Sequence, residues 1–202
     1  MAYVKQSDFV FDCMQCHTRC DGVSKGVYLF DNDVSFSEAY EQMIIDHINS
    51  TTRHTASKTE VPGHPDIEIR DEQNQLYCYL EVKVQQRTFM HIEKHLGSSS
   101  LKPSETVALN LSDLLRYFTI QKNTKIKTVI VWVLLNRLCV TGSDKHQFYF
   151  QTSNVLEAIY NSKKQSRMFR RKSGEGDVVD GVHKGVTVNY HFSLKELKRW
   201  KL

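Results

Sequence analysis

Two short stretches of the chain combine acidic residues and a lysine with alternating apolar residues, a composition suited to a carboxylate-based catalytic centre. The first stretch, HPDIEI, contains Asp66, and the second, LEVKV, contains Glu81 and Lys83. Side chains of a β-strand point alternately to its two faces, so Glu81 and Lys83 share one face of the second stretch. If the two stretches pair as a hairpin, Asp66 lies on that face as well. The pattern therefore predicts that these three charged side chains meet.

Two carboxylates held close together repel each other unless a cation lies between them. A hard divalent ion such as Mg²⁺ prefers oxygen ligands of this kind. Such an ion polarises a phosphodiester and makes a bound water more acidic, while Lys83 can orient that water and offset the developing charge. The alternative interpretation is an exposed hairpin with surface salt bridges, because alternating charged strands are common.

The same residues resemble a known sequence motif. Pro65-Asp66, followed by Glu81-Val82-Lys83, resembles the PD-(D/E)xK motif of the restriction-endonuclease-like nucleases, and the resemblance covers about residues 35–135. It implies that Asp66 and Glu81 are catalytic metal ligands, that the Val82 carbonyl is a further ligand, and that Lys83 assists the attacking water. It also implies Mg²⁺ as the cofactor, with Mn²⁺ as a substitute.

Members of that superfamily frequently add an acidic residue from the helix before the hairpin. Glu41 is the better candidate here, because isoleucines at +3, +4 and +7 place it towards the buried flank of its helix. A plain surface acid is the alternative for Glu41. Gln85 shares the face of Glu81 and Lys83, so it either lines the cleft or makes ordinary hydrogen bonds at the strand end.

The elements that must position these residues follow from periodicity and turn signals. We expect a helix from an N-cap at Ser35, with Glu38 as its capping-box partner, to about Asn49. The hairpin pairs 66–70 with 76–84. Later elements are helices over 109–118 and 153–162, a central strand buried on both faces over 127–135, strands over 148–150 and 186–192, and a final helix from Ser193. This order predicts an α/β fold with a restriction-endonuclease-like core, in which helices flank a central mixed β-sheet.

Positive charge is concentrated at the C-terminal end. Residues 163–202 contain eleven Lys or Arg against four acids, although the whole chain has a net charge of only +4. Such an asymmetry suits a polyanion-binding face beside an acidic centre, and a solvated lysine-rich terminus is the alternative. We therefore divide the chain into an N-terminal extension (1–33), a nuclease core (34–162) and a basic segment packing on the core (163–202). The predicted DNA-binding residues are Lys163, Lys164, Arg167, Arg170, Arg171 and Lys172.

A cysteine cluster in the N-terminal extension is the second chemically suggestive feature. Cys13, Cys16 and Cys20, with a histidine at position 17, could contribute to a tetrahedral zinc site. No second C-x-x-C pair exists, so we favour reduced, partly buried thiols over zinc. The first residues carry no secretory signal and no apolar run is long enough to span a bilayer, which predicts a cytoplasmic protein without a membrane partner.

These observations favour an Mg²⁺-dependent endonuclease that cuts DNA, with a type II restriction enzyme as the main interpretation. We expect a homodimer, because each active site of such an enzyme cuts one strand. The second interpretation keeps the same site but assigns a repair, recombination or mobile-element nuclease acting on branched or single-stranded DNA. The third is a non-catalytic nucleic-acid-binding module, which has no need for Asp66, Glu81 and Lys83 on one face.

Overall fold

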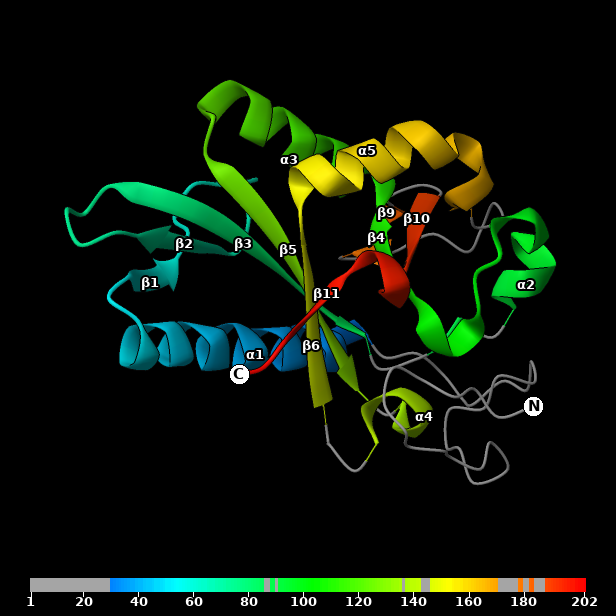
Figure 1. Cartoon of the computed structure of the whole chain (residues 1–202), viewed down its shortest axis with the longest axis horizontal. Helices are drawn as coiled ribbons and strands as arrows, with labels where there is room; N and C mark the ends of the chain where they lie inside the picture. The colour runs from blue at the N-terminus through cyan, green and yellow to red at the C-terminus, as the bar shows by residue number, and fades with distance from the viewer. Residues whose placement is uncertain are drawn as a thin grey trace.

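A computed structural model provides the structure of the chain (Figure 1). It describes residues 30–85, 88–89, 91–135, 137–142, 146–170, 178–179, 182–183 and 188–202. The cysteines at positions 13, 16 and 20 lie outside the described residues, as do Arg171 and Lys172.

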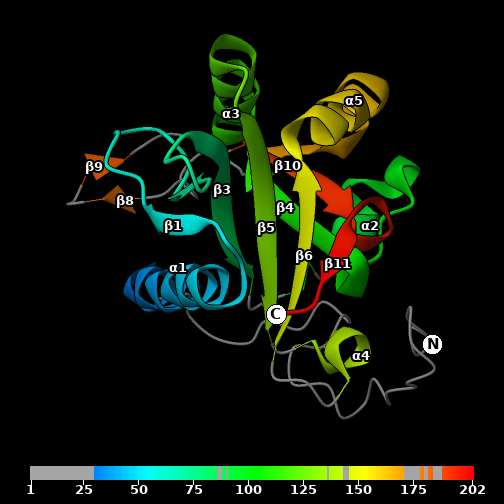
Figure 2. The same cartoon turned by 60° about the vertical axis from the view of Figure 1, so that its left-hand side comes forward.

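A six-stranded mixed β-sheet forms the centre of the fold, with the strand order β1-β2-β3-β5-β6-β11. The strands β3 and β5 run parallel, and every other neighbouring pair is antiparallel. The predicted mixed sheet flanked by helices is therefore confirmed (Figures 1 and 2). Its strands are β1 (Thr55–Lys58), β2 (Ile67–Arg70), β3 (Leu76–Gln85), β5 (Lys127–Leu135), β6 (His146–Thr152) and β11 (Lys198–Trp200).

One face of the large sheet packs against the long helix α1 (Phe30–Thr51). Isoleucines at helical spacing, Ile44, Ile45 and Ile48, lie in the same apolar cluster as the inward-facing residues of β2, β3 and β5. Burying this apolar stripe removes it from water and holds the helix on the sheet. Figure 2 shows α1 on the side of the sheet away from α3 and α5.

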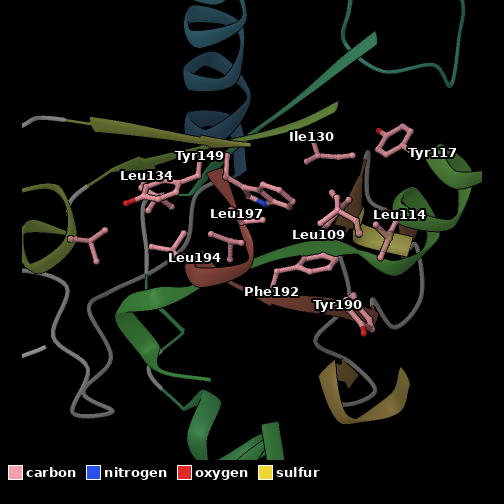
Figure 3. Packing of buried hydrophobic residues seen from close by; sticks show 14 of the residues in the cluster. Leu109, Leu114, Tyr117, Ile130, Leu134, Tyr149, Tyr190, Phe192, Leu194 and Leu197 are labelled. Carbon is pink, nitrogen blue, oxygen red and sulfur yellow. The ribbon is translucent and has the colours of Figure 1, made fainter. Parts of the chain in front are cut away.

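The opposite face packs against two helices and a second, smaller sheet. The helices are α3 (Leu111–Thr124) and α5 (Ser153–Lys163), and the small sheet has the order β4-β10-β7. Its strands are β4 (Thr106–Asn110), β10 (Val188–Ser193) and β7 (Met168–Arg170). A cluster of buried residues, which includes Trp132, fills the space between the layers. Figure 3 shows Tyr149 and Phe192 among its members. The remaining elements are the short helices α2 (Ile92–His95) and α4 (Leu138–Thr141) and the strand pair β8 (Val178–Val179) and β9 (Val182–His183).

The hairpin of β2 and β3 forms in the register that brings the two motif halves together. Ile67 pairs with Leu80, and Ile69 pairs with Cys78, so these residues point to the α1 face. Glu81 pairs with Ile130 of β5, and Lys83 pairs with Trp132. Because Ile130 and Trp132 belong to the cluster on the opposite face, Glu81 and Lys83 point to that face. The strand over 127–135 is buried on both faces apart from Lys127, as predicted.

Three predictions about element boundaries are wrong. Ser35 is no N-cap, because α1 already begins at Phe30. The helix expected from Leu109 begins at Leu111, since Leu109 and Asn110 belong to β4 and pair with β10. The final helix is replaced by one 3-10 turn (Leu194–Glu196) and the edge strand β11. Ser193 does cap that turn with a capping box, but the residues after it pair with β6 instead of continuing the helix.

Within the described ranges, no helix is both long and apolar enough to cross a membrane.

Candidate active site

The carboxylate of Asp66 lies directly against strand β3. Asp66 immediately precedes β2, and its backbone oxygen accepts a hydrogen bond from Thr59 N at 2.9 Å. Its Oδ2 accepts a hydrogen bond from the backbone N–H of Val82 at 2.8 Å. The N–H and C=O of one strand residue point to the same edge, so the Val82 carbonyl also faces the side of Asp66. The predicted meeting of Asp66 with the second strand is therefore present in the geometry.

Glu81 and Lys83 form a close ion pair on β3. Lys83 Nζ lies 2.5 Å from Glu81 Oε1. Glu81 is only 2 % exposed, and its Oε2 is buried without a hydrogen-bond partner among the described residues. A buried carboxylate oxygen without a donor is energetically unfavourable, because it has lost its water without replacement. This oxygen is therefore well suited to bind a cation.

The electrostatics of the cluster favour a proton or a cation at Asp66. The pKa of Asp66 is raised to about 7, first by burial and then by the charge of Glu81, with a smaller contribution from Glu41; the Val82 N–H and Lys83 act in the opposite direction. For Lys83, burial lowers the pKa, but Glu81, Asp66 and Asp113 outweigh it and hold the pKa above its usual value. Lys83 is therefore a permanent cation at neutral pH, whereas Asp66 carries its negative charge only at a cost.

Glu41 lies on α1 close enough to Asp66 for its charge to raise the pKa of Asp66, but it has partners of its own. It is 9 % exposed, accepts a hydrogen bond from Ser37 Oγ at 3.1 Å, and lies 3.4 Å from Lys58 Nζ. Within the part of the chain that the structure describes, no group of three or more acidic, histidine or cysteine side chains is arranged to hold a metal ion. Asp66 is hydrogen-bonded to Val82 and lies close enough to Glu81 for the charge of Glu81 to raise its pKa.

Gln85 shares the face of Glu81 and Lys83 but is bound to the small sheet. Its Nε2 donates to the Ala108 carbonyl at 3.1 Å, and its Oε1 accepts from Arg137 Nη2 at 3.5 Å. Of the two interpretations of Gln85, the geometry agrees with strand-end hydrogen bonding. Residue 86 lies outside the described residues.

Helix α3 adds three polar residues that the sequence did not single out. Arg116 Nη2 donates to the Tyr117 hydroxyl at 3.1 Å and lies 2.9 Å from Asp113 Oδ1. Burial raises the pKa of Tyr117 far above its usual range, and the adjacent charge of Glu81 adds to the shift. The acid–arginine spacing of i and i+3 was a visible signal, but it is common on solvated helices. Only the packing of α3 on β5 places these residues beside Glu81.

The predicted DNA-binding residues fall into two groups. Lys163, Lys164 and Arg170 are exposed at the end of α5 and on β7. Arg167 is instead buried, with Nη2 3.0 Å from Glu196 Oε1 and Nη1 3.5 Å from the His191 carbonyl oxygen. A guanidinium bound in this way serves the packing of the small sheet, so we do not expect it to contact a phosphate.

Comparison with known proteins gives one structural likeness. No protein-family model and no curated protein matches the chain. Among solved structures, the chain is similar to Hjc of Archaeoglobus fulgidus, a Holliday junction resolvase, at 9 % sequence identity and a TM-score of 0.42. The match covers 80 % of this chain and 86 % of that chain.

Proposed function

We propose that the chain is an Mg²⁺-dependent endonuclease that hydrolyses phosphodiester bonds in DNA. The observation that carries the proposal is the arrangement on β3: the Asp66 carboxylate bound to Val82 N, next to a buried Glu81 whose Oε2 has no partner among the described residues and whose Oε1 binds Lys83. A surface salt bridge would consist of one exposed carboxylate and a lysine. Here the carboxylate paired with Lys83 is that of Glu81, which is buried, and Asp66 is a second acid beside it. The PD-(D/E)xK resemblance of the same residues agrees with it.

The donor set fits a hard divalent ion. Asp66 and Glu81 each use one carboxylate oxygen within the protein, which leaves Asp66 Oδ1 and Glu81 Oε2 as ligands together with the Val82 carbonyl. Three oxygen ligands from the protein leave room for water and substrate, as is usual for Mg²⁺. When bound, the ion supplies Lewis-acid activation of the phosphodiester and of water. Glu41 can add a bond only if it leaves Lys58 or acts through a water.

Lys83 acts as a fixed cation in this mechanism. Because its pKa is held above the usual value, it keeps its proton and donates hydrogen bonds to the attacking water or to a phosphate oxygen. Water attacks phosphorus and gives up one proton, a new P–O bond forms as one ester P–O bond breaks, and the leaving oxygen takes up one proton. The products are a terminal phosphate monoester and a hydroxyl group. Glu81 keeps the Lys83 ammonium in place throughout.

The first test is cleavage of supercoiled plasmid DNA with Mg²⁺, Mn²⁺ or EDTA. We expect cleavage with either metal, none in EDTA, and a loss of at least about 100-fold in rate for Lys83→Ala and Asp66→Asn. Asp66→Asn keeps an oxygen that can accept from Val82 N, so its fold should be intact. Arg53→Ala is the matched control, because Arg53 forms an exposed ion pair with Glu72. Salt-sensitive DNA binding without metal-dependent cleavage would contradict the proposal and favour a binding module.

The DNA structure that is cut separates the two enzyme interpretations. Discrete bands from a plasmid indicate a type II restriction endonuclease. Preferential cutting of a synthetic four-way junction or of single-stranded DNA over the matched duplex indicates a repair, recombination or mobile-element nuclease; Hjc, the similar solved structure, is a Holliday junction resolvase. In both cases we expect a homodimer, which light scattering measures directly.

A further inference from the structure

Arg116 is a partly exposed cation next to the candidate active site. Its side chain is 44 % exposed, and it is held on two sides by residues of its own helix. The guanidinium carbon lies 5.1 Å from the centre of the Tyr117 ring, and Nη2 donates to the Tyr117 hydroxyl at 3.1 Å. Asp113 Oδ1 lies 2.9 Å from Nη2. Arg116 is thus positioned by neighbours while still in contact with solvent.

The register of the sheet places this cation beside Glu81. Tyr117 is 2 % exposed and lies in the buried cluster with Leu114 and Ile130 (Figure 3). Ile130 of β5 is the register partner of Glu81 on β3, and both side chains point to the face covered by α3. Burial and then Glu81 raise the pKa of Tyr117, so the Tyr117 hydroxyl lies close to the Glu81 carboxylate, and Arg116 Nη2 donates to that hydroxyl. Burial lowers the pKa of Arg116, but Tyr117, Asp113 and Glu81 together raise it above its usual value.

Ordinary helix stabilisation does not account for the whole arrangement. An exposed i,i+3 ion pair between Asp113 and Arg116 stabilises a helix by only about 0.2–0.5 kcal/mol. The pair has a further consequence, because it holds a partly exposed planar fork with several N–H donors near Glu81. Guanidinium forks match phosphate oxygens and are frequent where phosphate is recognised. A DNA substrate bound at Asp66 and Glu81 would place a phosphate on the face of the sheet that α3 covers.

We propose that Arg116 is a substrate-contacting residue, which binds the DNA phosphate at the Asp66–Glu81 site and offsets the charge that develops during its hydrolysis. This inference rests on the proposed nuclease function. Tyr117 and Asp113 act as positioning residues, since one accepts a hydrogen bond from the guanidinium and the other balances its charge. The Arg116 side chain is 44 % exposed, so a phosphate can approach it from the solvent.

The test uses the full chain and compares Arg116→Ala, Arg116→Lys and the double variant Asp113→Asn/Arg116→Ala. The double variant removes the acid that Arg116→Ala leaves without its partner. Lys122→Ala is the matched control, because it removes a positive charge from the same helix at its ion pair with Glu157. Two quantities are measured: kcat/KM on plasmid DNA with Mg²⁺, and the salt dependence of binding to a fluorescent 40-base-pair duplex in EDTA. Thermal unfolding confirms that each variant is folded.

We expect Arg116→Ala and the double variant to lower kcat/KM by about 100-fold. The slope of log K against log salt should decrease in magnitude by about one, the contribution of one phosphate contact. Arg116→Lys keeps the slope, since the charge remains, but loses part of the rate because it has no fork. Rates and slopes equal to those of Lys122→Ala would overturn the inference. If the unchanged chain does not cut DNA at all, the proposed function fails instead, and the two failures are distinguishable.

Discussion

At the scale of single residues, the negative charge of Asp66 opposes the stability of the folded chain. Its pKa is raised to about 7, first by burial and then by Glu81, so the folded chain keeps this proton up to a higher pH than the unfolded chain does. The unfolded chain has the ordinary, lower pKa of an aspartate. This group therefore contributes most to stability below about pH 4, and the contribution is lost as pH rises to 7. Active sites commonly retain such a cost because the charged form is needed for function.

Replacing Asp66 with asparagine should stabilise the metal-free protein at high pH. Asp66→Asn keeps an oxygen for the Val82 N–H but removes the charge, so we expect the free energy of unfolding at pH 8 to rise by about 1–2 kcal/mol. The gain over the unchanged chain should grow between about pH 4 and 7 and stay constant above. Urea unfolding in EDTA at several pH values measures it.

Two comparisons decide whether this effect belongs to the site. Asp46→Asn alters an exposed carboxylate that accepts from Gln42, and it should change stability little at any pH. With saturating Mg²⁺ the order should reverse, because a ligand that binds only the folded state stabilises the unchanged chain and not the variant. An Asp66→Asn protein that is less stable than the unchanged chain at pH 8 in EDTA would contradict the electrostatic account.

At the scale of elements, the order of apolar and polar residues predicted two kinds of strand. These are strands that pair with a neighbour in the sequence and strands that are buried on both faces. Alternation predicted the β2–β3 hairpin, and a run of apolar β-branched residues predicted β5. The pattern after Ser193 has helical spacing and a valid cap, yet Lys198–Trp200 forms a strand. The free edge of β6 and the packing of Trp200 against Phe148 and Phe150 override the local preference there.

The same distinction explains which site residues could be predicted. Glu81 and Lys83 lie on β3, and Asp66 immediately precedes the paired strand β2, so their meeting follows from hairpin alternation. Arg116 and Tyr117 come from a helix whose rotation and position on β5 depend on tertiary packing. No spacing in the sequence encodes that relation, and a polar residue beside a buried tyrosine gives a weak signal.

The joint between the large and the small sheet consists of Ala108, Trp132 and Gln85 and lies next to Lys83 on β3. The Ala108 carbonyl on β4 accepts hydrogen bonds from Trp132 Nε1 and from Gln85 Nε2, both at 3.1 Å. Trp132 is fully buried and is the register partner of Lys83. This contact fixes the small sheet against the strands that carry the site.

Trp132→Phe should therefore destabilise the protein by about 1–3 kcal/mol, because it removes a buried hydrogen bond and leaves a small cavity. Trp200→Phe is the matched control at a half-buried edge position, where the indole makes ring contacts with His47, Phe148 and Phe150. Chemical denaturation of both variants gives the comparison. A larger loss for Trp200→Phe than for Trp132→Phe would show that the joint contributes less than the edge strand.

At the scale of the whole molecule, positive charge in the sequence is not the same as positive charge available to DNA. The basic stretch from Lys163 to Arg170 leaves α5, forms a 3-10 turn and enters β7 of the small sheet. The turn exposes Lys163 and Lys164 but directs Arg167 inward to Glu196. One linear cluster therefore contains exposed cations that a polyanion can reach and an arginine that forms an ion pair inside the protein.

Substitutions in this stretch should separate the two roles. We expect the double variant Lys163→Gln/Lys164→Gln to keep its stability and to reduce the salt slope of DNA binding by about two, since each lysine that meets a phosphate releases about one counterion. Arg167→Gln should instead lower the free energy of unfolding by about 2–4 kcal/mol, because it leaves Glu196 without its buried partner, with the slope unchanged in the folded fraction. Denaturation curves and fluorescence anisotropy on the same duplex measure both quantities. An unchanged slope for the lysine variant would place the DNA-binding surface elsewhere on the molecule, and a reduced slope for Arg167→Gln would mean that the buried arginine turns outward when DNA binds.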